Sequence, residues 1–293
     1  MANTLLEQFL RAAGLQHLRR LFLTTGLLLT AAVGAAESPT GPVYSFGVVP
    51  QQSATELART WVPLINLLQA KSGLQLRFAT APDIPSFERR LAAGDYDFAY
   101  MNPYHYTVFH RQPGYQVFAR EKDRLLKGIV VVRKDSPYQA LADLRDQTVV
   151  FPAPASFAAT VLVRASFAGQ HIAITPKFVS SHDSVYFNVA RGFYPAGGGV
   201  IRTFENLEPA TRDQMRILWT SQGYTPHAIA AHPRLAAGTV KRLQEAMLAL
   251  DNDPDGRAVL EGIGFKGIVT AGDADYDAVR NLHLELLEPP TEN

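Results

Sequence analysis

The chain has 293 residues, of which 47% are hydrophobic and 19% charged, and its formal net charge is +1. This composition is typical of a globular protein with a sizeable core, and it excludes a largely disordered chain and a strongly basic nucleic-acid-binding surface. The sequence contains no cysteine, which excludes disulfides, thiol catalysis, cysteine-ligated metals and a lipid anchor on an N-terminal cysteine.

The first 36 residues differ from the rest. Arg11, Arg19 and Arg20 precede an apolar run over 21–30, and small residues fill 31–36. This order predicts a secretory signal peptide cleaved after Ala35 or Ala36. A retained membrane anchor is the alternative, although the apolar run is short for a span of about 20 residues.

Strand and helix patterns then alternate. Residues 44–49 predict a strand, and apolar residues at helical spacing predict a helix over 57–70 that Gly73 ends. A strand over 74–78, a short helix over 87–93 and a strand over 96–100 follow. This β-α-β-α-β order favours an open, largely parallel sheet, in which ligands bind at the carboxyl ends of the strands.

A second module begins with the apolar strand 127–133. Residues 143–151 lead into another strand, and its further predicted elements are a helix over 156–167, a strand over 177–179, a helix over 183–191 and a strand over 196–201. Leu218 and the stretch 228–231 are followed by a helix predicted over 237–250.

Five segments in order carry a resemblance to a known family. They are residues 46–52, 97–104, 132–137, 181–192 and 196–200. Together they resemble the phosphate/phosphite/phosphonate-binding proteins of ABC importers, over residues 43–270.

The resemblance implies the α/β fold of type II periplasmic binding proteins, with two Rossmann-like lobes joined by a two-segment hinge. Lobe 1 would comprise residues 43–127 and 228–293, and lobe 2 residues 130–220. We therefore expect an exported periplasmic monomer that captures a small phosphorus oxyanion between its lobes. Its partner would be an ABC permease in the inner membrane, and no cofactor, metal or nucleic acid is expected.

Residue types support an anion site at the start of the helix predicted from Ser156. The Ser156 hydroxyl and the N–H groups of Phe157 and Ala158 could hold an oxyanion, with the helix dipole adding favourable potential. Alternatively, Ser156 only caps its own helix. Phe157 stands where relatives often have a hydroxyl residue.

His182 precedes another predicted helix, with Ser181 as its expected N-cap, and matches a ligand contact of the family. Its imidazole can donate a neutral or a charged hydrogen bond. Tyr100, Asn102 and Tyr104 lie at the carboxyl end of the third strand and offer further donors. A buried core role is equally compatible with Tyr100.

Two positions depart from the family in charge. Relatives that bind aminophosphonates carry acidic residues where this chain has Arg202 and His227. Arginine matches an oxyanion in two-point geometry, so we expect phosphate, phosphite or a simple phosphonate rather than 2-aminoethylphosphonate. The alternatives are a surface Arg202 paired with Glu205 or Glu208, and a hinge-region core role for His227.

Two other functions compete with transport. A hydrolase would need more than the adjacent His182 and Asp183, and the sequence has neither a Gly-x-Ser-x-Gly elbow nor a His-Glu-x-x-His motif. A ligand-sensing ectodomain would use the same cleft, and a retained N-terminal apolar segment would favour it.

Overall fold

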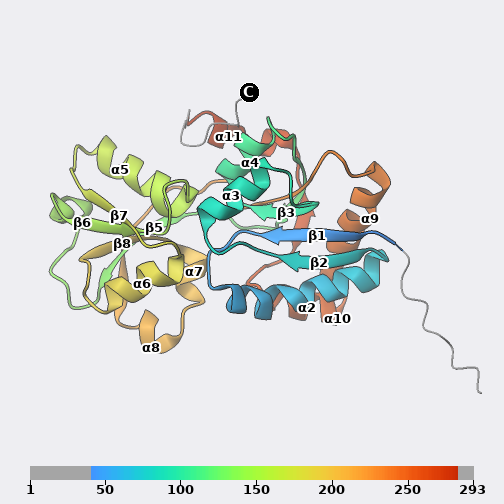
Figure 1. The fold of residues 1–293 in the computed structure, drawn as a ribbon. Helices are drawn as coiled ribbons and strands as arrows, with labels where there is room; N and C mark the ends of the chain where they lie inside the picture. The colour runs from blue at the N-terminus through green and yellow to red at the C-terminus, as the bar shows by residue number, and fades with distance from the viewer. Residues whose placement is uncertain (1–40, 283–293) are drawn as a thin grey trace, which may run out of the picture. The chain divides into compact units, whose positions relative to one another are not determined.

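The computed structural model describes residues 41–282, so the predicted signal peptide over 1–36 lies outside the described residues. This part contains two β-sheets, each with helices on both of its faces (Figure 1). Within it, no helix combines the length and the apolar character that crossing a membrane requires.

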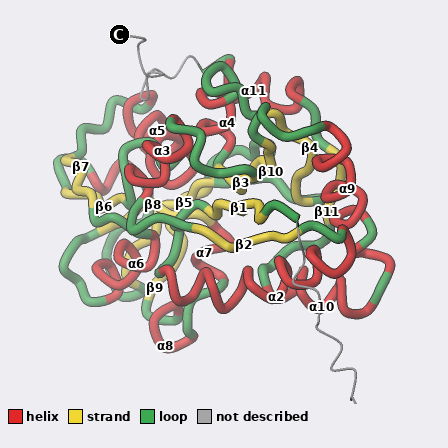
Figure 2. The backbone as a smooth tube through the Cα atoms, turned by 45° about the vertical axis from the view of Figure 1, so that its right-hand side comes forward, coloured by secondary structure: helices red, strands yellow, loops and turns green. Residues whose placement is uncertain are grey.

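The larger sheet has the strand order β11-β4-β10-β3-β1-β2. Figure 2 shows β10, β3, β1 and β2 side by side. Strand β1 pairs in parallel with β2 and β3, whereas β10 runs antiparallel between β3 and β4, and β11 antiparallel to β4. The predicted largely parallel sheet is therefore mixed. The strands are β1 Val43–Val48, β2 Gln75–Ala79, β3 Phe98–Met101, β4 Gln116–Glu121, β10 Ala228–Ala231 and β11 Ile268–Thr270.

Helices α3 and α4 lie on one side of this sheet, and α2 and α10 on the other (Figure 1). Helix α2 begins before the predicted residue 57 because the Ser53 hydroxyl accepts a hydrogen bond from the Glu56 N–H and caps it. The bounds are α2 Ala54–Ser72, α3 Ile84–Ala92, α4 Pro103–Phe109, α9 Ala237–Leu248, α10 Pro254–Gly262 and α11 Asp277–Arg280, with short 3₁₀ turns at Leu250–Asn252 and Asp273–Tyr276.

The second sheet has the order β7-β6-β8-β5-β9, with β6 parallel to both of its neighbours and β5 antiparallel to both of its own. Its strands are β5 Gly128–Arg133, β6 Thr148–Phe151, β7 Thr175–Phe178, β8 Ala196–Val200 and β9 Met215–Thr220. The helices are η2 Leu141–Leu144, η3 Phe157–Leu162, α5 Val163–Gly169, α6 His182–Ala190, α7 Ile201–Glu205 and α8 Pro209–Arg212.

Alternation along β5 explains why helices cover both faces of this sheet. Val130 and Val132 pack into one buried cluster with Val163 and Phe167 of α5. Ile129 and Val131 point the other way and pack with α6. Successive side chains of a strand point to opposite faces, so a strand as apolar as β5 is buried on both sides.

Two connecting segments, 122–127 and 221–227, join the two sheets. They pair with each other, because the Leu126 N–H donates to the Tyr224 carbonyl at 2.8 Å and the Tyr224 N–H to the Leu126 carbonyl at 2.9 Å. The chain therefore passes between the sheets twice at one place, beside the ends of the strands that carry the predicted site.

Candidate functional site

A small cavity of about 10 Å³ collects most of the predicted site residues. Its walls come from the loops that follow β1 and β3, from β8, from helix starts beside both sheets and from the connecting segments. Its volume suits about one water molecule. The lining residues are Val49, Gln51, Ile84, Asn102, Leu126, Ser156, Phe157, Ala158, His182, Val200 and His227.

Ser156 lies at the start of a helix that opens with a π-helical stretch, η3, and continues as α5. The Ser156 side chain accepts no hydrogen bond from an N–H of this helix. The alternative that Ser156 serves only as a helix cap is therefore wrong. The first N–H groups of any helix have no acceptor inside it. In this helix these N–H groups lie beside the cavity, because Phe157 and Ala158 line the cavity.

Two glycines let this helical stretch lie directly against the sheet. A Cβ atom at Gly128 of β5 would lie 2.1 Å from the Ala158 carbonyl oxygen. A Cβ atom at Gly198 of β8 would lie 2.1 Å from the Ala159 carbonyl oxygen. Any larger residue would therefore displace the backbone that presents Ser156 to the cavity.

His182 begins α6, and Ser181 is its N-cap, as predicted, through a hydrogen bond accepted from the Ser184 N–H at 3.1 Å. The imidazole is fully buried, with Nε2 3.4 Å from Ser156 Oγ and Nδ1 3.4 Å from Thr203 Oγ1. Tyr186 continues this polar chain, with its hydroxyl 2.8 Å from Thr203 Oγ1. Burial lowers the pKa of His182 to about 3, so the ring is neutral at neutral pH.

His227 is buried with both ring nitrogens lacking a hydrogen-bond partner among the described residues. Its ring stacks on Tyr100, with centroids 4.8 Å apart and planes at 17°. Burial lowers the pKa of His227 well below its usual value, and the nearby Arg202 lowers it further. A neutral, unsatisfied imidazole in a cavity wall is costly unless a bound group pairs with it.

Asn102 lies between the two sheets. Its Oδ1 accepts from the His105 N–H at 2.7 Å and caps α4, and its Nδ2 donates to the Ala155 carbonyl at 3.2 Å. Phe157 lines the cavity and packs edge-on against Tyr224. Tyr104 is buried in the core and lies outside the lining of this cavity.

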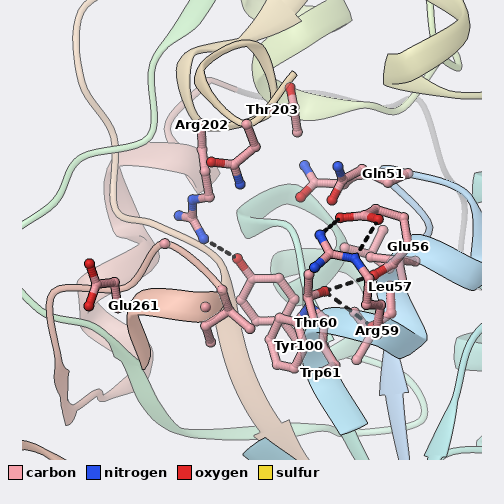
Figure 3. A pocket seen from close by; sticks show the side chains of 17 residues that line it. Gln51, Glu56, Leu57, Arg59, Thr60, Trp61, Tyr100, Arg202, Thr203 and Glu261 are labelled. Atoms are coloured by element: carbon pink, nitrogen blue, oxygen red, sulfur yellow. Dashed lines mark hydrogen bonds and ion pairs between the residues drawn. The ribbon is translucent and has the colours of Figure 1, made fainter. Parts of the chain in front are cut away.

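Arg202 and Tyr100 line a neighbouring, larger cavity of about 240 Å³, which shares Val49 and Gln51 with the small one. Figure 3 shows the Arg202 guanidinium directed at the Tyr100 hydroxyl, to which its Nη1 donates at 3.0 Å.

The other end of the Arg202 guanidinium forms an ion pair with Glu121, which is 1% exposed. The guanidinium also lies over the Phe265 ring at 4.8 Å. Arg202 is thus paired with Glu121, and not with Glu205 or Glu208 as in the alternative considered for it, and it does not line the small cavity. An oxyanion clamp by Arg202 remains a prediction that these contacts do not favour.

Sequence reasoning missed Gln51, Thr203, Tyr186 and Glu121. Gln51 stands in the first family-like segment, and its carbonyl accepts from the His182 N–H at 3.1 Å, but nothing in the pattern marks it as a cavity wall. The other three act through side chains that only the tertiary structure brings together. Over residues 41–282, no group of three or more His, Asp or Glu side chains could hold a metal ion.

Fold and site together define a type II periplasmic binding protein. Two solved structures share this fold: a binding-protein component of an ABC phosphonate transporter from Pseudomonas aeruginosa (17% identity, TM-score 0.76, covering 83% of this chain and 85% of that one), and PhnD1 from Prochlorococcus marinus in complex with methylphosphonate (17% identity, TM-score 0.74, covering 82% and 96%). A curated relative, the phosphate-import protein PhnD of Mycolicibacterium smegmatis, is 23% identical over 86% of this chain and 87% of its own.

The family model for the phosphonate periplasmic substrate-binding protein of ABC transporters matches residues 46–276. The chain therefore belongs to this family of ABC-transporter substrate-binding proteins, as the five segments predicted. A small ligand, a permease partner and a periplasmic place of action follow from that membership.

Proposed function

We propose that the chain binds a phosphate, phosphite or simple phosphonate in the small cavity and delivers it to an ABC permease. One observation carries the proposal: the buried ring nitrogens of His227 have no partner among the described residues, in a cavity that also holds Ser156 and the first N–H groups of a helix. Neutral donors that converge on one point suit a tetrahedral oxyanion.

We also propose that the two sheets belong to lobes that part to admit the ligand. With about 10 Å³ the cavity is too small for a tetrahedral oxyanion. The lobes would be residues 43–127 with 228–293, and residues 130–220, turning about the paired segments near Leu126 and Tyr224. Signal-peptide cleavage and a monomeric state belong to the same proposal.

The chain is proposed to bind without catalysing a reaction, even though Ser156 Oγ and His182 Nε2 lie 3.4 Å apart. In the Ser-His-Asp arrangement a carboxylate orients the imidazole, and a general base needs a pKa near the working pH. Here Thr203 faces Nδ1, and burial lowers the pKa of His182 to about 3. The neighbouring Asp183 accepts instead from the Ser53 backbone N–H.

Titration calorimetry with phosphate, phosphite and methylphosphonate tests the function. At least one of them should bind, and Ser156→Ala should weaken that binding roughly tenfold or more, the usual scale for a hydrogen bond to a charged group. Ser166→Ala is the matched control, because Ser166 lies on the same helix with its hydroxyl on the Leu162 carbonyl. No binding of any of the three, or release of product from a chromogenic phosphate ester, contradicts the proposal.

A further inference from the structure

Thr160 is a fully buried polar residue close behind Ser156. It lies in η3 and is not among the described residues that line either cavity. A threonine inside a helix usually turns its hydroxyl back to the carbonyl three or four residues earlier. Here the hydroxyl instead donates to the Ala153 carbonyl, seven residues earlier, at 2.7 Å. This hydrogen bond therefore reaches out of the helix and holds the loop that joins β6 to η3.

The same residue also fixes the backbone of Ser156. The Thr160 N–H donates to the Ser156 carbonyl at 2.8 Å, and the Val161 N–H donates to that carbonyl at 3.2 Å, which is the π-helical bond. The Ser156 N–H donates to the Ala153 carbonyl at 3.2 Å, so this oxygen is shared between Ser156 and the Thr160 hydroxyl. Both backbone groups of Ser156 are therefore tied to Thr160, one directly and one through Ala153.

These bonds matter for an anion because they engage the carbonyl groups of the loop. A loop has nearly as many carbonyl oxygens as N–H groups, and a carbonyl oxygen directed at an oxyanion repels it. The Ala153 carbonyl accepts from Thr160, the Ala155 carbonyl from Asn102 Nδ2 and the Ser156 carbonyl from the helix. Each of these three oxygens is thus directed at a protein donor, while Ser156 lines the cavity with a hydroxyl that accepts from no N–H of the helix.

Removal of the Thr160 hydroxyl should move the loop rather than the helix. The helical stretch is fixed against the sheet, where two of its carbonyl oxygens leave no room for a Cβ atom at Gly128 or Gly198. Ala153 is buried, and its carbonyl would keep only the longer bond from the Ser156 N–H. A buried carbonyl that loses a donor is costly, so we expect the loop to shift and Ser156 to shift with it.

We infer that Thr160 is a positioning residue of the anion site: it touches no ligand itself, and its hydroxyl holds the loop so that Ser156 faces the cavity. The inference rests on the proposed function of this cavity and deepens it. It predicts that the affinity for an oxyanion depends on a hydroxyl at position 160, outside the cavity lining.

Calorimetry with Thr160→Val and Thr160→Ser tests the inference, using whichever of phosphate, phosphite and methylphosphonate binds the natural chain. Valine lacks the donor, and its methyl group would crowd the Ala153 carbonyl, so affinity should fall at least about fivefold. Serine keeps the hydroxyl, so affinity should stay within about twofold of that of the natural chain. Thr160→Ala removes the donor without crowding and should lower affinity at least about threefold, also if Thr160→Val fails to fold.

A matched control and a double variant separate positioning from a general loss of stability. Thr107 is also buried, and its hydroxyl donates to the Tyr104 carbonyl at 2.9 Å on α4, outside the cavity lining. Thr107→Val should therefore lower the melting temperature but change affinity less than about twofold. Because Thr160 acts through Ser156, the two losses should not add, and in the Ser156→Ala background Thr160→Val should lower affinity by a smaller factor than it does alone.

The contradicting outcomes are distinct. Full affinity in a folded Thr160→Val or Thr160→Ala protein, or an equal loss in Thr160→Ser, overturns the positioning role of the hydroxyl. Losses that multiply fully in the double variant overturn the path through Ser156. If the natural chain binds none of the three oxyanions, the proposed function itself is wrong, and the inference falls with it.

Discussion

Replacing Arg202 with methionine should destabilise the protein strongly while keeping a side chain of similar length. Glu121 is 1% exposed, and the side chain of Arg202, which pairs with it, is 13% exposed. Removing one member of a buried pair typically costs about 3–5 kcal/mol, because the other charge stays buried. Arg124 lies 3.9 Å from the other oxygen of Glu121 and compensates in part. We therefore expect a loss of about 3 kcal/mol at pH 7.

Denaturant unfolding of Arg202→Met, Glu121→Met and the double variant measures this. The double variant should lie within about 1–2 kcal/mol of the natural chain, since an apolar pair can replace a buried ion pair at little cost. Lys241→Met is the control, because Lys241 and Glu245 form an exposed pair at 3.8 Å worth about 0.5 kcal/mol or less.

Acid should reduce the loss in Arg202→Met. Burial raises the pKa of Glu121, with Arg202 and Arg124 opposing that rise. Without Arg202 the folded-state pKa rises further, so the carboxyl takes up a proton as pH falls and no longer carries an uncompensated charge. A loss below 1 kcal/mol at pH 7, or a double variant as unstable as the sum of the singles, refutes the ion-pair account.

Three further results are expected. Gly198→Ala should cost about 1–3 kcal/mol and weaken anion binding, because its Cβ would lie 2.1 Å from the Ala159 carbonyl oxygen, and unchanged calorimetry and melting would contradict this. His182 has a pKa of about 3 when folded and about 6.5 when unfolded. Below pH 6.5 only the unfolded chain gains the proton. The free energy of unfolding of the natural chain should therefore fall by about 2 kcal/mol more between pH 6.5 and pH 5 than that of His182→Gln, and equal falls would contradict this prediction. Methylphosphonate should bind at least tenfold tighter than 2-aminoethylphosphonate, about 1.4 kcal/mol, because no carboxylate lines the cavity for the ammonium. Calorimetry in which the aminophosphonate has the higher affinity would contradict this prediction.

Calorimetry on Arg202→Met also separates the two roles considered for Arg202. An oxyanion clamp predicts a loss of 1.5–3 kcal/mol, roughly ten- to hundredfold in affinity. A guanidinium held by Glu121 and Tyr100 predicts a change below tenfold, provided the variant is folded at the assay temperature. We expect the smaller change.

The fold was predictable where the sequence is periodic. Apolar spacing located α2, and the continuous apolar run over 127–133 predicted a strand, which the structure has as β5 between two buried clusters. The pattern did not reveal β4 or β11. Only three apolar residues stand in β4, between polar ones, and β11 has three residues in all, so neither gives a clear signal.

The site was predictable only in part. The family-like segments contain Asn102 and His182. The predicted helix start gave Ser156 and Phe157, and the departure in charge from relatives gave His227. The structure brings all five to one cavity. None of these signals could show that Glu121, 81 residues earlier in the chain, pairs with Arg202. A side chain's charge is visible in a sequence, but the partner that neutralises it depends on tertiary contacts.

A crystal structure of the chain with methylphosphonate at pH 6 tests the central claim most directly. The account predicts the oxyanion between Ser156 Oγ and the His227 ring, with its remaining oxygens facing the N–H groups of Phe157 and Ala158. Methylphosphonate bound instead against Arg202 in the larger cavity, or an empty small cavity in crystals grown with excess ligand, would contradict it.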